Sequence, residues 1–175
     1  MKRKILALFL VLASAPGCMS AYVKQVGGDV DRSYTRTFIA DYETAWDALQ
    51  DAMKSEKFET SNKEAGFVQT QWGDNTHALN AEEAYYGSAV YVSAHYRMKV
   101  HLTKTFFEGV PAVKLSVQKD QMIQLDVLEG QKAMESNGID EHTFLYRVGR
   151  LIYMKLKLAE AEKAKKEQEL KNAKF

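Results

Sequence analysis

The sequence predicts an α+β domain in which an antiparallel sheet of four to five strands carries two helices packed on one face. Segments with apolar residues at helical spacing are separated by segments of alternating apolar and polar residues, so the element order is strand, helix, strands, helix. The longest alternating segment has one apolar and one polar face. Both amphipathic helices are therefore expected to pack on the apolar face, which leaves the other face to solvent.

The first half of the domain is predicted to contain a strand, a helix and a hairpin. Residues 33–40 are rich in β-branched and aromatic side chains and predict the first strand. Asp41 can cap the following helix, which extends to about Lys57 and has an apolar stripe of Tyr42, Ala45, Trp46, Leu49, Ala52 and Met53. Residues 58–61 and 67–72 then predict two strands joined by a tight turn.

The clearest strand covers residues 92–103, where every second residue is apolar. A turn at residues 108–109 leads to a return strand over residues 113–118, and the alternation continues weakly through Ile123, Leu125 and Val127. Between the two predicted hairpins, residues 73–87 form an irregular insertion, whose Tyr85 and Tyr86 are candidates for exposed contacts. Trp46 and Trp72 are both expected in the core.

A loop with Gly130, Asn137 and Gly138 precedes the final helix, whose buried side is marked by Phe144, Val148, Leu151, Ile152 and Leu156. Residues 159–175 have no apolar stripe. They predict a charged helical extension stabilised by Glu–Lys pairs worth about 0.2–0.5 kcal/mol each. The domain itself is therefore expected to span residues 33–158.

An apolar leader precedes this domain. Three basic residues and a short apolar run lead into Cys18, the one cysteine of the chain. The junction resembles the lipobox of bacterial lipoproteins, which implies that residues 1–17 are a lipoprotein signal peptide and that Cys18 carries acyl chains. Two N-terminal acyl signals suffice for stable membrane anchoring. Residues 18–32 are small and polar and predict a flexible tether between membrane and domain.

A competing interpretation is ordinary secretory cleavage after residues 13–15, which read Ala-Ser-Ala. The lipobox usually has Leu where this chain has Ala15, and Pro16 is unusual there. Secretory cleavage, however, would place Pro16 directly after the cut and leave a lone thiol in an oxidising compartment.

Composition excludes several function classes. The leader contains three of the 24 basic residues and none of the 23 acidic ones, so the remaining chain has 24 − 3 = 21 against 23, a net charge of −2. No strong positive field for nucleic acid remains. Beyond the leader no apolar stretch approaches the roughly 20 residues of a membrane span.

No catalytic constellation, cofactor motif or metal site is predicted, so the protein is not expected to be an enzyme. His95 and His101 lie six residues apart on one strand, about 20 Å, which is too far for one metal ion. His77 falls in the insertion. His142 with Asp140 and Glu141 could bind a metal, but an acidic first turn of the helix explains these carboxylates better.

The polar face of the central strands carries the candidate partner surface. His95, Arg97 and Lys99, with Lys114 on the return strand, could form a basic stripe for an acidic partner or anionic headgroups. The alternative is an ordinary solvated sheet face.

Four segments have the pattern of a known family: DYETAWDALQDAM, KEAGFVQTQW, MKVHLT and TFLYRVGRLIYMKL. With them, residues 34–158 resemble a helix-grip domain of the lipoprotein C component of the bacterial outer-membrane β-barrel assembly machine. The element order also resembles the lipopolysaccharide-assembly lipoprotein that plugs a barrel transporter. The first resemblance implies a helix-grip-like, lipid-anchored, non-catalytic envelope protein that works through its surfaces, and both resemblances imply association with a barrel. Met19 stands where an Asp would resemble the inner-membrane retention signal, which implies the outer membrane, facing the periplasm.

The predicted function is that of a lipid-anchored interaction or assembly-accessory module at the outer membrane, with an envelope protein partner that belongs to a β-barrel assembly or transport complex. The alternative is a lipoprotein that binds a small apolar or lipidic ligand between helices and sheet, with Met98, Met122 and Met134 as adaptable lining.

Overall fold

The computed structural model describes residues 33–76, 93–124, 127–128 and 130–173. The chain divides into two units, residues 1–31 and 32–175, and all described residues belong to the second. The predicted signal peptide, the acylated Cys18 and the tether lie outside the described residues, as do His77, Tyr85 and Tyr86.

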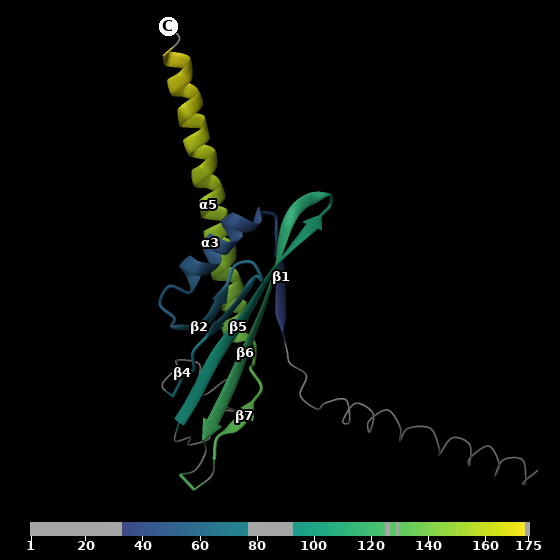
Figure 1. Ribbon diagram of the computed structural model, residues 1–175, viewed down its shortest axis with the longest axis vertical. Coiled ribbons are helices and arrows are strands. Elements are labelled where there is room, and N and C mark those ends of the chain that lie inside the picture. Colours follow the sequence, from purple (N-terminus) through teal and green to yellow (C-terminus); the bar gives the residue numbers. More distant parts are fainter. Residues whose placement is uncertain (1–32, 77–92, 125–126, 129, 174–175) are drawn as a thin grey trace, which may run out of the picture. The chain divides into compact units, whose positions relative to one another are not determined.

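The described chain is α+β, with two helices and an antiparallel sheet of seven strands (Figure 1). The strand order is β1-β6-β5-β3-β2, while β4 pairs with β5 and β7 pairs with β6. The elements in chain order are β1 (Tyr34–Phe38), α3 (Tyr42–Ala52), β2 (Phe58–Asn62), β3 (Phe67–Thr70), β4 (Gly73–Asp74), β5 (Ser93–Phe107), β6 (Val110–Gln124), β7 (Lys132–Met134) and α5 (Ile139–Asn172).

The strand count exceeds the predicted four to five because β4 and β7 contain only two and three residues. Segments this short have no detectable period, so only the partner strand reveals them.

The β5–β6 hairpin is the centre of the sheet. Its fifteen residue pairs run without a bulge from Ser93 opposite Gln124 to Phe107 opposite Val110. In each strand, alternate residues therefore stay on the same side of the sheet along the whole strand. Strand β6 continues six residues beyond the predicted return strand.

One face of this hairpin packs against both helices and forms the core. Trp46 is 6% exposed, as predicted. The buried apolar cluster joins residues of α3 (Ala45, Trp46, Ala48, Leu49, Ala52), of β5 (Met98, Val100, Leu102), of β6 (Val113, Leu115, Val117) and of α5 (Phe144, Leu145, Val148, Ile152).

Helix α3 begins as predicted and ends earlier. The Asp41 carboxylate accepts a hydrogen bond from the Thr44 N–H at 2.8 Å, and hydrogen bonds from Thr44 hold the pKa of Asp41 below its usual value. The helix ends at Ala52 rather than near Lys57. Met53, which is buried, forms the C-cap, and the chain then turns so that Phe58 can start β2.

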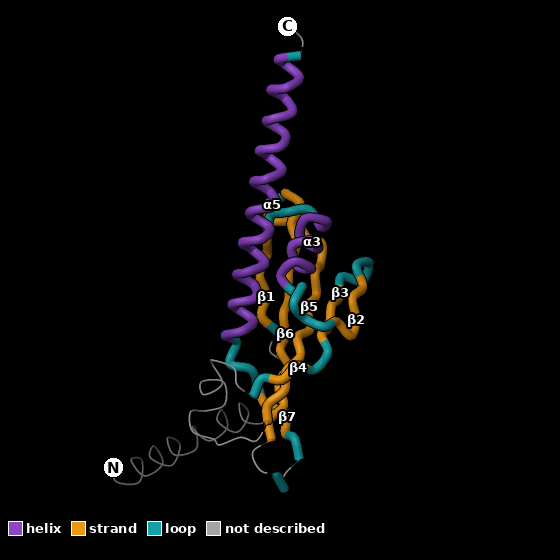
Figure 2. The backbone as a smooth tube through the Cα atoms, turned by 90° about the vertical axis from the view of Figure 1, so that its left-hand side faces the viewer, coloured by secondary structure: helices purple, strands orange, loops and turns teal. Residues whose placement is uncertain are grey.

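Helix α5 has 34 residues, which corresponds to about 50 Å. It packs on the sheet as far as Leu156, and residues 157–172 are exposed on all sides. Figures 1 and 2 show this second half continuing past the end of the sheet. No described helix combines the length and hydropathy needed to span a membrane.

Candidate functional site

The sheet face opposite the helices carries all four residues of the predicted partner surface. His95, Arg97 and Lys99 alternate along β5, and Lys114 lies opposite Thr103 on the same face. Thr103 is eight residues from His95, so Lys114 and His95 lie about 27 Å apart along the strands. Arg97 and Lys99 are thus brought together, whereas Lys114 is separate from them.

Asp120 sits between the two cations. Its Oδ2 accepts a hydrogen bond from Arg97 Nε and forms an ion pair with Lys99 Nζ, each at 2.8 Å, while its Oδ1 accepts from Gln118 Nε2 at 2.9 Å. The local charge of these three ionisable groups is therefore +1 rather than +2. Asp120 is absent from the predicted surface, although a turn at residues 108–109 already implies that Arg97 faces residue 120.

Trp72 also belongs to this face, and its predicted core position is wrong. Its side chain is 39% exposed, and the Arg97 guanidinium carbon lies 4.8 Å from the ring centroid, which is a cation–π contact. Alternation from the buried Val68 and Thr70 would place Trp72 inside. However, β3 ends at Thr70, so the alternation no longer applies at Trp72.

A pair of aromatic rings, from Phe67 and His101, lies further along β5 on the same face. The Phe67 ring lies 4.7 Å from the His101 ring, and these residues face each other across β3 and β5. None of the described helices covers this face. We call Phe67, Trp72, Arg97, Lys99, His101 and Asp120 together the outer patch.

The interactions of Asp120 in the outer patch make the stability of the domain depend on pH. Burial alone would raise the pKa of Asp120, but the hydrogen bonds from Lys99 and Arg97 outweigh it and lower that pKa. A carboxyl whose folded pKa is lowered contributes stability above its unfolded pKa and loses it as the pH falls through the folded value.

We therefore expect Asp120→Asn to reduce the free energy of unfolding at neutral pH, with the difference from wild type shrinking below about pH 4. Urea unfolding of both proteins at several pH values measures this. A difference that stays constant down to pH 2 would contradict the ion-pair assignment.

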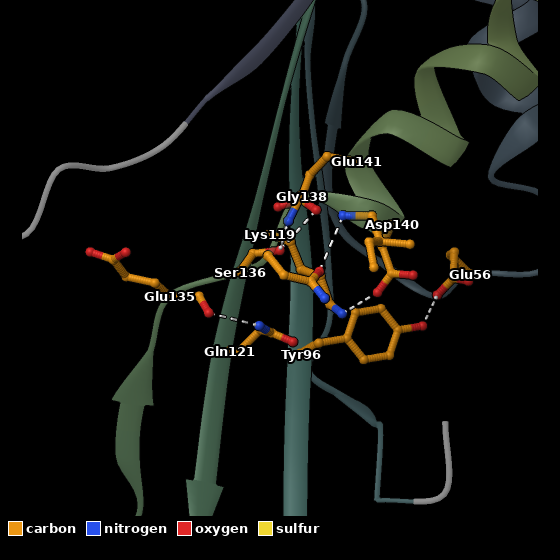
Figure 3. A network of polar contacts seen from close by, with 11 residues as sticks. Glu56, Tyr96, Lys119, Gln121, Glu135, Ser136, Gly138, Asp140 and Glu141 are labelled. Carbon is orange, nitrogen blue, oxygen red and sulfur yellow. Dashed lines mark hydrogen bonds and ion pairs between the residues drawn. The ribbon is translucent and has the colours of Figure 1, made fainter. Parts of the chain in front are cut away.

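A second polar cluster lies on the helix-facing side, below the start of α5 (Figure 3). Lys119 and Gln121 occupy positions of β6 where the alternation points inward, and they are 6% and 2% exposed. Lys119 Nζ forms an ion pair with Asp140 and lies 5.3 Å from the centroid of the Tyr96 ring. The sequence signal for both residues is the continued period of two beyond Val117, which places them on the dry face.

Tyr96 extends this cluster toward α3. Its hydroxyl donates to Glu56 Oε2 at 3.3 Å. Burial, reinforced by the negative charge of Glu56, raises the pKa of Tyr96 to about 12, so the phenol stays protonated at physiological pH.

Glu141, in the first turn of α5, is fully buried. Ser136 Oγ donates to its Oε2 at 2.8 Å and accepts from the Gly138 N–H at 3.2 Å. Within the part of the chain that the structure describes, the Oε1 atoms of Glu141 and Gln121 have no hydrogen-bond partner.

A cavity of about 220 Å³ opens beside this cluster, lined by Glu56, Asn75, Tyr96, Met98, Lys119, Asp140, Thr143, Phe144 and Arg147. Four of these nine residues carry charged side chains, and Tyr96 adds a phenol. Of the three methionines expected to line an apolar gap, only Met98 is among them. Met122 lies on the other face, opposite His95. The lining therefore does not favour an apolar ligand.

Asp140, Glu141 and His142 at the start of α5 do not point toward a common site. Glu141 points into the domain, Asp140 pairs with Lys119, and His142 packs edge-on against the Tyr34 ring with 4.8 Å between centroids. The described residues contain no group of three side chains that could hold a metal ion.

No protein-family model matches the chain, and a search of curated proteins finds no match.

Proposed function

We propose that the protein is a lipid-anchored, non-catalytic lipoprotein of the outer membrane, facing the periplasm, that acts as an interaction or assembly-accessory module. Acyl chains on Cys18 provide the anchor, and the outer patch provides the contact with an envelope protein. The observation that carries the proposal is the sheet face left uncovered by the described helices, where two cations and two aromatic rings are grouped.

The composition of the outer patch supports a protein contact. Trp and Arg are the residue types most enriched among residues that dominate binding energies. Here Arg97 is held over the Trp72 ring and by Asp120, so little side-chain entropy remains to be lost on binding. Arg97, Lys99 and Asp120 together have a charge of +1, so the patch fits a partner surface of net negative charge.

The arrangement of helices and sheet supports the helix-grip-like comparison. The two helices share one core with one face of β5 and β6, which is the packing expected from the order strand, helix, strands, helix. On this basis the proposed partner is a component of a β-barrel assembly or transport complex.

The anchor is tested with Cys18→Ser. Cells that express wild type or this variant are labelled with a radioactive fatty acid and fractionated. We expect label on the wild type in the membrane fraction, and loss of both label and membrane association in the variant. An unlabelled wild-type protein, or a mature N-terminus other than residue 18, would contradict the anchor.

The outer patch is tested by inverting its charge while keeping its ion pairs. The triple variant Arg97→Glu, Lys99→Glu, Asp120→Lys changes the local charge from +1 to −1, and Lys114→Glu on the same sheet face is the matched control. With a photo-crosslinker placed at position 95, two residues from Arg97 on the same face of β5, we expect the otherwise wild-type protein and Lys114→Glu to crosslink to a membrane protein and the triple variant to lose this product. Equal crosslinking by all three proteins would contradict the assignment.

A further inference from the structure

The end of the β5–β6 hairpin exposes a compact set of apolar side chains. Phe106 is 73% exposed, Phe107 48% and Val110 47%. Phe107 is paired with Val110, and Phe106 with Pro111, so these four residues form two successive pairs next to the turn. We call residues 106–111 the hairpin tip. Exposed apolar clusters of this kind mark protein or membrane contacts.

The hairpin tip stands clear of the rest of the described domain. Figure 1 shows the end of the hairpin projecting away from α5. A Cβ atom added to Gly109 would meet nothing within 4 Å. The tip is therefore a convex projection, and its apolar residues do not fill the core.

The turn keeps the tip narrow. Glu108 and Gly109 both have positive φ, at 50° and 79°, which is the geometry of a two-residue hairpin turn whose twist matches its strands. The strands stay paired up to Phe107 and Val110, so the four apolar side chains are held on a rigid ribbon.

Basic side chains lie behind the tip. Lys104 is opposite Val113, and Lys114 is opposite Thr103, so both lie within about 20 Å of the turn. Both are exposed, and Glu108 is the acidic residue of the tip itself. Apolar residues in front and lysines behind suit a bilayer that contains anionic headgroups, since cations near such a surface are attracted to it.

We propose that the hairpin tip inserts into the interface of the bilayer to which Cys18 is anchored, as a second membrane contact that orients the domain. This inference rests on the proposed lipid anchor. Tyr34 lies opposite Val117, eight residues and about 27 Å from Gly109. Cys18 precedes Tyr34 by 34 − 18 = 16 residues, which span at most about 55 Å. The chain is thus long enough for both contacts with one membrane.

The anchor makes a weak tip contact sufficient. Once one part of a molecule is bound, a second site acts at an effective concentration in the millimolar range for short linkers. Two phenylalanines and a valine, too few to hold a free domain on a membrane, can therefore keep an anchored domain in one orientation.

The test uses the full chain, acylated and reconstituted in vesicles of phosphatidylcholine with a minor share of phosphatidylglycerol. Because acylation blocks the thiol of Cys18, a cysteine introduced by Phe107→Cys is the single site for an environment-sensitive dye. The matched control is Leu170→Cys, an exposed apolar position in the second half of α5. We expect a blue-shifted emission at position 107 that brominated lipids quench severalfold more than at position 170.

Two outcomes would overturn the proposal while leaving the anchor intact. One is equal emission and quenching at positions 107 and 170 in vesicle-bound protein. The other is a blue shift at position 107 that requires added envelope proteins, because the tip would then bind a protein. Failure of the anchor is recognised separately, since an unacylated Cys18 would take up a second dye and the chain would not co-sediment with vesicles.

Discussion

Gly66→Ala is expected to lower the free energy of unfolding by about 3 kcal/mol. Gly66 has a φ of +64°, and an added Cβ would lie 2.1 Å from the carbonyl oxygen of Leu102. Rotation of a side chain cannot relieve that contact, because the carbonyl oxygen of Leu102 belongs to the backbone.

The position matters because it connects the β2–β3 hairpin to the central strands. The Gly66 carbonyl accepts a hydrogen bond from the Leu102 N–H at 2.7 Å, and Leu102 is part of the core. Moving the strands apart at this point would break that bond and loosen the packing of Leu102. Urea unfolding followed by far-ultraviolet circular dichroism gives the change.

Gly109→Ala is the matched control for this variant. Gly109 has a φ of +79° but open space around its Cα, so alanine there introduces only the unfavourable backbone conformation, about 1 kcal/mol. The difference between the two variants measures the steric contact at Leu102. If both variants lost the same free energy of unfolding, the backbone of Leu102 would not lie close enough to Gly66 to exclude a side chain there.

Ser136→Ala is expected to destabilise the domain by about 2 kcal/mol. The hydroxyl is the hydrogen-bond donor to the fully buried carboxylate of Glu141 and the acceptor for the Gly138 N–H. Glu141 Oε1 has no hydrogen-bond partner among the described residues, so loss of Ser136 Oγ also removes the donor to the other carboxylate oxygen. A buried polar group left without a partner carries its full desolvation cost.

A double-mutant cycle with Glu141→Leu isolates this interaction. When the buried carboxylate is absent, Ser136→Ala should cost only about 0.5 kcal/mol, because the bond from Gly138 is then the main loss. Unfolding midpoints in urea for the four proteins give the coupling. Additive effects of the two substitutions would contradict a direct Ser136–Glu141 interaction.

The candidate surface could be predicted from the sequence only in part. The period of two places Arg97 and Lys99 on the polar face, and the turn at residues 108–109 sets Asp120 opposite Arg97. Counting residues back from this turn therefore predicts that the Asp120 carboxylate offsets one of the two positive charges. Trp72 is different: where a strand ends depends on its neighbours, and β3 ends before the alternation reaches it.

The sequence by itself determined the α+β class, the order of elements, the Asp41 cap and the core stripes of both helices. These features depend on local periodicity and on side chains within one turn of each other. The period of two already places Lys119 and Gln121 on the helix-facing side. Only the tertiary structure decided that Trp72 is exposed and that two very short strands join the sheet. Burial and pairing depend on which distant segment packs opposite a residue, and that information is not carried by the residue's own neighbours in the chain.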